Sequence, residues 1–561
     1  MRKVRLLALL SWVAACSANV VDEPLAEPTD DVEAPPGGQD IAAGEEEGTI
    51  GVATSALATT TELKIFGDSN RDGVLSDADI AGRFDWRWNG AGAFMLANVD
   101  DDDDDGKSDA ADTRVNGVAD EADLAPLAVR IGPQTLAAGH SVHVTPWQSP
   151  TGAQRIHVYQ RTNAGWRLVE GKLEGIAPEM ELAIEATTFA SKSWTGLVTL
   201  KLEVKAADGR SLGYDLAKVR VAPFLLLPNA AKTKELYVST GHPNYANATF
   251  RAELASVAAS SNAKLVTHTT SSWKEMWMQD TMEVGYTQLP GRAPEHVVIG
   301  GLRGADSFGP SRLGRDVGFV QIGAPRGIAN GVDDWADWMG NLEVTPPLPG
   351  YPLGRVFYGR NTDTGIGMHP DVVAFLEAQK VQAPFWIDTG FLTIKHVDEI
   401  VTFLVGADGK VRLVLADTRR AEALVPSEHG PSNTKNQARL DKILNGGTYG
   451  GGQVSRGLLA ELALPASQIV RLPVSYVGGH NVWSNPVNSI FVNGVVVTGN
   501  SKVPSNVATE IEASLRAAGA TSVKFVNDSR YQENLGNVHC ATNTLKLPVV
   551  ADFTKALPLV P

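Results

Sequence analysis

The sequence predicts an α/β domain that follows a domain of β-strands. Between residues 130 and 220, several stretches alternate apolar and polar residues, which is typical of strands joined by short turns and favours an immunoglobulin-like sandwich. These stretches include His157–Gln160, Leu182–Thr187 and Leu197–Val204. From about Ala222, helical stretches alternate with short β-rich segments, which indicates an α/β domain.

The elements behind the α/β prediction are spread over the C-terminal half of the 561-residue chain. Helices are expected at Ala252–Ala258, Asp371–Gln379 and Asn506–Ala518. Strands are expected at Ile394–Val405, Arg412–Ala416, Ser489–Val497 and Val523–Val526. We find no sequence repeat.

The first residues have the composition of an export signal. A basic start is followed by the apolar stretch Leu6–Val13 and by two alanines before Cys16. This pattern predicts a bacterial lipoprotein signal over residues 1–16, with acyl chains on Cys16 anchoring the exported chain to a membrane. Ser17 resembles the sorting pattern of outer-membrane lipoproteins. A plain signal peptide, cut nearby, is the alternative.

Acidic residues are concentrated near the N-terminus. From Asp22 to Asp123 there are 27 acidic and 6 basic residues, whereas Leu124–Pro561 has 37 acidic and 40 basic residues. Residues 17–58 are rich in Glu, Asp, Pro, Ala, Gly and Thr, so we expect a disordered acidic stalk there. The distribution argues against nucleic-acid binding and favours cation binding.

The chain has only two cysteines, Cys16 and Cys540. With Cys16 lipidated, Cys540 has no disulfide partner, and a single cysteine in an exported protein suggests a reactive thiol. A buried inert cysteine is the alternative.

Two acidic segments predict calcium binding. The first has the spacing of an EF-hand-type loop, in which oxygen ligands alternate, a glycine makes the sharp turn and an acid closes the loop. Its expected ligands are Asp68, Asn70, Asp72 and Asp79, with the turn at Gly73. The second begins at Asn98 and contains six adjacent aspartates, which repel one another unless cations are present. A solvated turn and a disordered acidic run are the respective alternatives.

Three C-terminal segments carry candidate catalytic residues. They are W-M-Q-D-T-M-E-V-G-Y from Trp277 to Tyr286, H-V-D-E from His396 to Glu399, and N-V-H-C-A-T-N from Asn537 to Asn543. On a strand, His396 and Asp398 would share one face, which suits a site and equally suits a satisfied polar pair. On the same strand argument His539, beside Cys540, would point to the opposite face and be structural.

These segments resemble the catalytic domain of the protein-arginine deiminases, which have W-[IM]-Q-D-E-M-E-x-G-Y, G-H-V-D-E and H-C-x-T-N in the same order. Further matches are G-N-L-E-V-T-P-P (Gly340–Pro347), Y-P-L-G-R (Tyr351–Arg355), V-Q-A-P (Val381–Pro384) and F-V-N-D (Phe525–Asp528). W-x-W-x-G-x-G-A-x-x-L-x-N-x-D, Trp86 to Asp100, resembles the family's calcium-binding middle domain. The resemblance implies a middle domain over 59–217 and a catalytic domain over 218–561, without the first domain of the vertebrate enzymes.

The resemblance also implies a five-bladed α/β propeller of the pentein type, with the site on its axis. By position, Asp280 and Asp398 would hold a guanidinium, His396 would be the general acid/base and Cys540 the nucleophile. Trp277 would line the pocket, and Arg303 would bind the substrate backbone. Family calcium ligands map onto two groups of residues. One is Gln279, Glu283 and Glu343 with the carbonyls of Met339 and Leu342, and the other is Asn98, Asp100, Asp102, Asp112 and Asp123.

The chemistry of a guanidinium fits these residue types. A planar, permanently charged fork of N–H donors is best held by carboxylates in bidentate contact. Its carbon is a poor electrophile, so a thiolate is required, and a nearby protonated histidine favours that thiolate. The histidine can then give a proton to departing ammonia and take one from water.

Some positions depart from the family pattern. Thr281 and Gly300-Gly301 stand where one calcium site has Glu and Asp-Ser, and Ala305 and Asn534 stand where vertebrate members have arginines. These departures leave open the number of calcium ions and the way a peptide backbone is held. Three alternatives to a calcium-dependent protein-arginine deiminase therefore remain: an enzyme for free arginine or agmatine-type guanidines, a non-catalytic calcium-binding surface lipoprotein, and a calcium-stabilised adhesin.

Overall fold

The computed structural model describes residues 63–137, 139–148, 150–242, 246–303, 306–324, 332–448 and 454–557. All of these belong to one unit, Leu57–Pro561. The predicted signal, Cys16 and the whole of the predicted stalk lie outside the described residues, as does Ala305. Among the described helices, none has the length and apolar character needed to cross a membrane.

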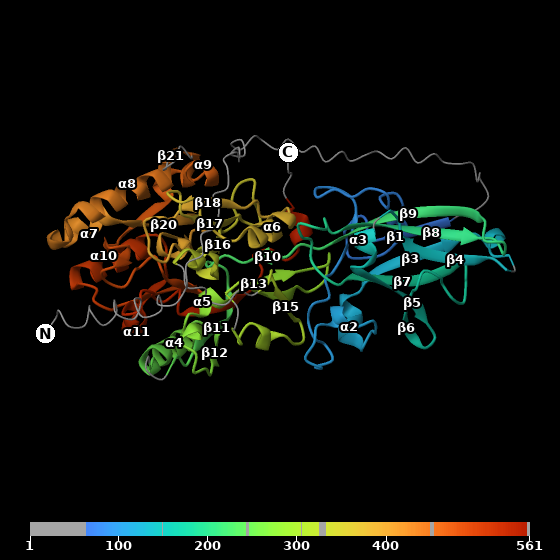
Figure 1. The fold of residues 1–561 in the computed structure, drawn as a ribbon, viewed down its shortest axis with the longest axis horizontal. Coiled ribbons are helices and arrows are strands. Elements are labelled where there is room, and N and C mark those ends of the chain that lie inside the picture. Colours follow the sequence, from blue (N-terminus) through green and yellow to red (C-terminus); the bar gives the residue numbers. More distant parts are fainter. Residues whose placement is uncertain are drawn as a thin grey trace, which may run out of the picture. The chain divides into compact units, whose positions relative to one another are not determined.

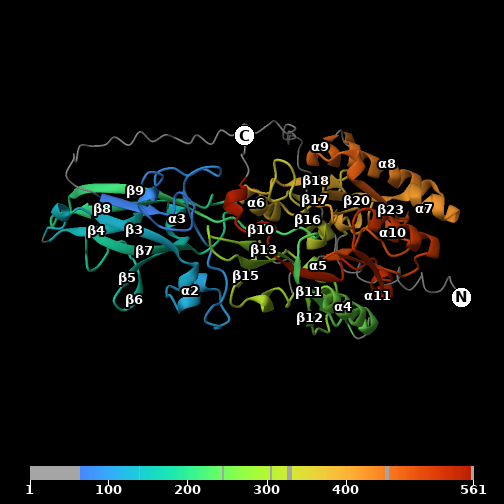
Figure 2. The same cartoon turned by 180° about the vertical axis from the view of Figure 1, so that it is seen from behind.

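Two sheets form the N-terminal part and lie one over the other (Figures 1 and 2). The first has five antiparallel strands in the order β1-β3-β7-β5-β6, and the second has the order β2-β9-β8-β4, in which only β2 and β9 are parallel. The strands are β1 (Leu63–Gly67), β2 (Ala93–Met95), β3 (Ala125–Ile131), β4 (Ser141–Pro146), β5 (Ile156–Thr162), β6 (Gly165–Leu168), β7 (Glu179–Ala186), β8 (Leu197–Lys205) and β9 (Ser211–Val221). Two short helices, α2 (Val118–Asp123) and α3 (Pro150–Ala153), accompany them. The strands predicted between residues 130 and 220 are confirmed.

Among the described residues, five sheets of three or four strands follow, and they share one strand pattern. In each, a central strand is antiparallel to one neighbour and parallel to another, in the orders β10-β13-β14-β15, β12-β11-β29, β16-β17-β18, β19-β20-β23 and β26-β27-β28. The strands are β10 (Leu225–Leu226), β11 (Thr233–Ser239), β12 (Lys264–His268), β13 (Met282–Thr287), β14 (Glu295–Gly300), β15 (Val317–Gln321), β16 (Leu342–Val344), β17 (Val356–Arg360), β18 (Phe385–Asp388), β19 (Val401–Val405), β20 (Val411–Asp417), β23 (Ile469–Pro473), β26 (Ile490–Val492), β27 (Val495–Gly499), β28 (Ser522–Val526) and β29 (Thr542–Lys546). The architecture therefore repeats where the sequence shows no repeat.

Helices connect the parallel strands of these sheets (Figure 1). They are α4 (Ala248–Ser260), α6 (Pro370–Ala378), α7 (Thr418–Leu424), α8 (Pro431–Asn445), α9 (Leu458–Leu462) and α10 (Ser505–Ala517), with the single turns α5 (Met278–Thr281) and α11 (Ser529–Gln532). Helix α6 shows why they form: His369 caps its N-terminus by accepting the Asp371 N–H, Pro370 opens it, and apolar side chains one turn apart are buried. The three predicted helices and the α/β prediction are confirmed.

The strand predicted over Ile394–Val405 is only partly correct. Lys395 has a φ of 64°, which ends the extended run, and a single 3₁₀ turn, Val397–Glu399, follows before β19 begins at Val401. His396 and Asp398 therefore do not share one strand face. The strand predicted over Ser489–Val497 is a hairpin of β26 and β27, because Asn493 and Gly494 both take positive φ in its turn.

One hydrophobic core joins the N-terminal sheets to the C-terminal part. Phe189 packs edge-on against Phe224 and Phe375 across this boundary. The Gln379 amide binds both sides, accepting from Phe224 N at 3.0 Å and donating to Ala190 O at 3.0 Å. The calcium-binding candidates of the N-terminal part are thus held against the sheets that carry the catalytic candidates.

Candidate active site

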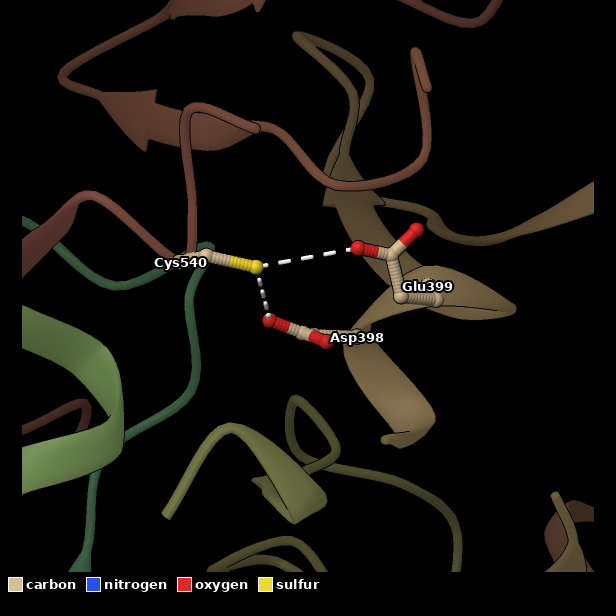
Figure 3. Close-up of side chains that lie close together, drawn as sticks. All are labelled: Asp398, Glu399 and Cys540. Carbon is tan, nitrogen blue, oxygen red and sulfur yellow. Dashed lines mark hydrogen bonds between the residues drawn. The ribbon is translucent and has the colours of Figure 1, made fainter. Parts of the chain in front are cut away.

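Cys540 lies in the turn before β29, with 3% of its surface exposed. Its sulfur has three polar neighbours: Asn488 Nδ2 donates to it at 3.0 Å, and Asp398 Oδ2 and Glu399 Oε1 lie 3.5 and 3.7 Å away. Figure 3 shows the two carboxylates on adjacent residues pointing at the sulfur from one side. The sequence-predicted nucleophile is therefore beside one of the two predicted guanidinium-binding acids.

His396 and Asp280 form a second pair. His396 Nε2 hydrogen-bonds the Trp335 carbonyl at 2.8 Å, which leaves Nδ1 facing Asp280 Oδ1 at 3.6 Å. Gly340 leaves room for both side chains, because a Cβ at this position would lie 2.6 Å from His396 Nδ1 and 2.7 Å from Asp280 Oδ1. No contact between His396 and the Cys540 sulfur is found among the described residues. The expected pairing of a thiolate with His396 is therefore absent from this state.

His539 is not turned away from the site. It precedes β29 and lies in an irregular turn, so the strand argument that assigned it to the opposite face is wrong. Its Nδ1 lies 2.9 Å from Asp398 Oδ2 and its Nε2 lies 3.2 Å from Glu343 Oε1. His539 therefore links Asp398, a predicted guanidinium ligand, to Glu343, a predicted calcium ligand.

Arg303 is fully buried and lies beside Asp280. Its Nη1 is 3.8 Å from Asp280 Oδ2, and its guanidinium carbon is 4.7 Å from the centre of the Trp338 ring. The residue predicted to bind the substrate backbone thus places its own cation near the carboxylate predicted to hold the substrate. Trp277 packs edge-on against Tyr531, in the same apolar cluster as Cys540.

Burial shifts the pKa values of the titratable groups of the site away from their ordinary values. Burial raises the pKa of Asp280 to about 6 and that of Asp398 to about 7. Burial, reinforced by Asp398 and Glu399, raises the pKa of the Cys540 thiol well above its usual value, and burial lowers the pKa of His396. Asp280 Oδ1 and Asp398 Oδ1 have no hydrogen-bond partner. A cation with N–H donors would satisfy both oxygens and lower both pKa values.

Sequence reasoning missed Glu399 as a site residue. Three asparagine amides hold its carboxylate: Asn481 and Asn485 donate to Oε2, and Asn488 donates to Oε1 at 3.3 Å. Its position directly after Asp398 in H-V-D-E was the available signal. The strand prediction obscured that signal, because adjacent residues on a strand face opposite ways.

The predicted calcium ligands of the C-terminal part lie together. Gln279, Glu283, Leu342 and Glu343 line one hollow, and Met339 is buried three residues before Leu342. Burial raises the pKa of Glu343 to about 7 and that of Glu283 well above its usual value. Lys546 lines the same hollow, and burial lowers its pKa to about 7. The carboxylate set suits Ca²⁺, although a lysine shares the space.

The run of six aspartates divides by alternation. Asp100 and Asp102 form a group with Asp123, whereas Asp101 and Asp103 form another with Asp109. The run lies in bends rather than in a strand, and its division into two groups separates charges that would otherwise repel. The run follows β2, and Ala97 forms an isolated bridge with Ala186 just before it.

Glu295, on β14, adds a carboxylate that the sequence did not reveal. Among the described residues, both of its oxygens, both of Asp102 and Oδ1 of Asp100 are buried with no hydrogen-bond partner, and Arg315 Nε lies 3.8 Å from Asp102 Oδ1. Burial and the neighbouring aspartates raise the pKa of Asp100 to about 7, that of Asp123 to about 8 and that of Glu295 well above its usual value. So many unpartnered buried oxygens fit a hard cation such as Ca²⁺.

Two further predicted ligands, Asn98 and Asp112, differ from each other. Asn98 is buried and its Nδ2 donates to Asp120 and Glu185, whereas its Oδ1 has no hydrogen-bond partner among the described residues. Asp112 is half-exposed and accepts from Arg114 N and Asn116 Nδ2. No contact between Asp112 and the group of Asp100, Asp102 and Asp123 is found among the described residues.

The loop that contains Asp68, Asn70, Asp72 and Asp79 has a structural copy. Asp72 N and Gly73 N donate to the two oxygens of Asp68, and Asp105 N and Gly106 N donate to those of Asp101 in the same way. The φ angles also agree, at 58° and 85° for Arg71 and Gly73 and at 59° and 83° for Asp104 and Gly106. The D-x-D-x-D-G run at 101–106 was the signal for this repeat, and the surrounding aspartates hid it.

Comparisons with known proteins assign the family. The protein-arginine deiminase model matches residues 211–444, and the model for the middle domain of these enzymes matches residues 62–205. Together they account for more than half of the chain. The chain belongs to the protein-arginine deiminase family. As a member it is an enzyme, a hydrolase acting on carbon–nitrogen bonds of amidines.

Its similarity to individual members is distant but extensive. Human protein-arginine deiminase type-4 is 26% identical over 89% of this chain and 83% of its own length. Mouse protein-arginine deiminase type-1 is 26% identical over 92% of this chain and 85% of its own length. Among solved structures, agmatine deiminase of Enterococcus faecalis is 11% identical with a TM-score of 0.37, covering 58% of this chain and 97% of its own.

Proposed function

We propose that this enzyme converts arginine residues of proteins to citrulline and ammonia. The observation that carries the proposal is the convergence of a buried thiol, a histidine and two carboxylates that each have an unpartnered oxygen. A guanidinium is the cation that such a pair of carboxylates would orient best. The similarity to protein-arginine deiminases, in the middle domain as well as in the catalytic one, supports arginine within a protein as the substrate.

In this proposal Asp280 and Asp398 bind the substrate guanidinium and hold its carbon near Cys540. The sulfur attacks that carbon, and His396, as the acid, protonates the amino group that leaves as ammonia. The product of this step is a thiouronium attached to Cys540. Water then adds to the same carbon with His396 as the base, the carbon–sulfur bond breaks, and citrulline is released.

The decisive experiment compares two substrates. The purified protein is assayed for citrulline with an arginine-containing peptide and with free arginine, each with millimolar Ca²⁺ and with chelator, beside Cys540→Ser. We expect calcium-dependent citrulline from the peptide and none from the variant. Activity on free arginine alone would replace the protein substrate by a small guanidine. No citrulline from a folded, calcium-loaded sample would favour a binding protein.

Gly340→Ala is expected to lower kcat/KM for the peptide about 100-fold. The added methyl group would displace His396 or Asp280, and misplacing a catalytic group by about 1 Å can cost two orders of magnitude. Gly314→Ala is the matched control, because a methyl group there meets no atom within 4 Å. Equal activity of Gly340→Ala and Gly314→Ala would contradict the assigned places of His396 and Asp280.

Calcium is the proposed cofactor, and several ions are proposed. Gln279, Glu283 and Glu343 with the carbonyls of Met339 and Leu342 would hold one, and Asp100, Asp102, Asp123 and Glu295 would hold another. Bound Ca²⁺ would supply charge that neutralises these carboxylates. The loops of Asp68 and Asp101 are further candidates.

The finer architecture and the location are also proposals. Five sheets of one pattern, with the C-terminal strand β29 paired to β11, support a five-bladed propeller. Two stacked, mainly antiparallel sheets support an immunoglobulin-like middle domain. The basic and apolar N-terminal residues before Cys16 support export and a lipid anchor, with the outer membrane as the proposed location.

A further inference from the structure

Transfer of the thiol proton needs an acceptor that the mechanism above does not name. The Cys540 thiol is buried and its pKa is raised, so the resting sulfur carries a proton. That proton must leave before or while the sulfur attacks. The proton acceptor has to contact the sulfur. It must also be a group whose charged form has no other role in the reaction.

Neither histidine meets these conditions. His396 Nε2 is bonded to the Trp335 carbonyl and its Nδ1 faces Asp280. His539 has both ring nitrogens occupied, by Asp398 and by Glu343. Within the described part of the chain, the sulfur contacts only Asn488, Asp398 and Glu399 among polar side chains.

Asp398 is unsuited to accept the thiol proton, because it has another role in the proposed reaction. It is assigned to the substrate guanidinium, and a protonated carboxyl would lose the ionic part of that interaction. It also receives the His539 Nδ1 contact at 2.9 Å on the oxygen nearest the sulfur. Glu399 has no comparable task, because its oxygens contact only asparagine amides and the thiol.

We propose that Glu399 is a catalytic base that takes the proton from the Cys540 thiol. The proposal rests on the proposed deimination at this site and adds a catalytic residue to it. Glu399 Oε1 lies 3.7 Å from the sulfur, and Figure 3 shows it approaching from the side opposite the Cys540 main chain. The Asn488 amide donates to the sulfur and to Glu399 Oε1 together, so it orients both partners of the transfer.

The proton balance closes over one turnover. The S–H bond breaks, Glu399 becomes a neutral carboxylic acid, and the sulfur electron pair forms the bond to the guanidinium carbon. His396 protonates the leaving ammonia. When water has added with His396 as base and the carbon–sulfur bond breaks, the sulfur recovers its proton from Glu399. The proton left on the hydroxyl oxygen is released to solvent, where the ammonia freed in the first half of the reaction takes up a proton and becomes ammonium.

The surroundings of Glu399 permit both protonation states. Burial raises its pKa to about 7, with Asp398 adding to the effect, whereas the amides of Asn481 and Asn485 favour the charged form. The other titratable groups near it are Cys540, His539 and Tyr476, whose hydroxyl donates to the Glu399 backbone carbonyl. An acid near neutrality is suited to accept a proton and return it.

The test replaces Glu399 by Gln and measures two quantities that a base and a structural residue affect differently. We expect kcat for the peptide to fall about 100-fold with KM little changed, because Asp280 and Asp398 stay in place. Without substrate, the pKa of the thiol, read from the pH dependence of iodoacetamide alkylation, should fall, because a negative neighbour is gone. Turnover and free-thiol ionisation thus move in opposite directions.

Two further variants guard against a folding artefact. Glu399→Asp keeps the charge but withdraws it from the sulfur, and it should lose at least about tenfold in kcat at an unchanged melting temperature. In Glu399→Ala, added acetate should restore turnover in proportion to its concentration. The matched control is Glu235→Gln, a buried glutamate on β11 held by Tyr237 and Lys264.

The outcomes separate this proposal from the proposed function. Wild-type kcat in Glu399→Gln or Glu399→Asp would overturn the role of Glu399 while leaving deimination intact. A fall in kcat that Glu235→Gln shares, with no acetate rescue of Glu399→Ala, would likewise overturn it. Absence of citrulline with the wild-type protein would instead refute the proposed function itself.

Discussion

Asp398→Asn is expected to lower kcat/KM for citrulline formation about 1,000-fold, which corresponds to about 4 kcal/mol of transition-state stabilisation. The substitution keeps the size of the side chain but removes the charge that would hold the substrate guanidinium. It also changes the oxygen that contacts both His539 and the Cys540 sulfur. Citrulline release from an arginine peptide at saturating Ca²⁺ measures the effect.

The control for Asp398→Asn is Asp388→Asn, at the end of β18. Asp388 is fully buried and pairs with Arg439, so its loss should lower the melting temperature while kcat/KM is kept. Asp398→Asn should instead lower kcat/KM while the melting temperature is kept. Its carboxylate has a raised pKa and an unpartnered oxygen, so the fold gains little from its charge. If Asp398→Asn retained its activity, Asp398 could not be one of the two carboxylates that hold the substrate guanidinium.

The sequence names four candidate catalytic residues but does not show how they are arranged. Cys540, His396, Asp398 and Asp280 were found through motifs, and the structure places Asp398 beside Cys540 and Asp280 beside His396. The pairing of His396 with the thiol was not found. Whether two motifs meet depends on how sheets far apart in sequence are packed, which local patterns do not encode.

The missed residues share a physical reason. His539 was assigned to the wrong face, and Glu399 was not considered as a site residue, because both lie in irregular turns where the period of two of a strand does not hold. Glu295 is a single acid in an apolar strand, and only the docking of that strand against the aspartates gives it a role. The repeated strand pattern was equally hidden, since the same topology can be built from different apolar residues.

Calcium is expected to raise the melting temperature strongly at pH 8 and weakly at pH 5. Without calcium, the native state binds protons on Asp100, Asp123 and Glu295 more tightly than the unfolded chain does, because their pKa values are raised to about 7, about 8 and well above normal. The free energy of unfolding therefore falls as pH rises from about 4 to about 8. Ca²⁺ binds the ionised carboxylates and reverses this loss, by about 2.7 kcal/mol per site at 100 times Kd.

Thermal unfolding with Ca²⁺, Mg²⁺ and chelator at both pH values measures this prediction, and two variants separate the sites. Glu295→Gln should stabilise the calcium-free protein at pH 8, because it removes one of the mutually repelling carboxylates, and should reduce the gain from Ca²⁺. Glu343→Gln should keep the part of the calcium-induced rise in melting temperature that comes from Asp100, Asp102 and Asp123. If Ca²⁺ did not change the melting temperature at pH 8, the result would contradict the proposed cation sites. Stabilisation that is lost in Glu295→Gln and kept in Glu343→Gln would locate it between the aspartate run and β14.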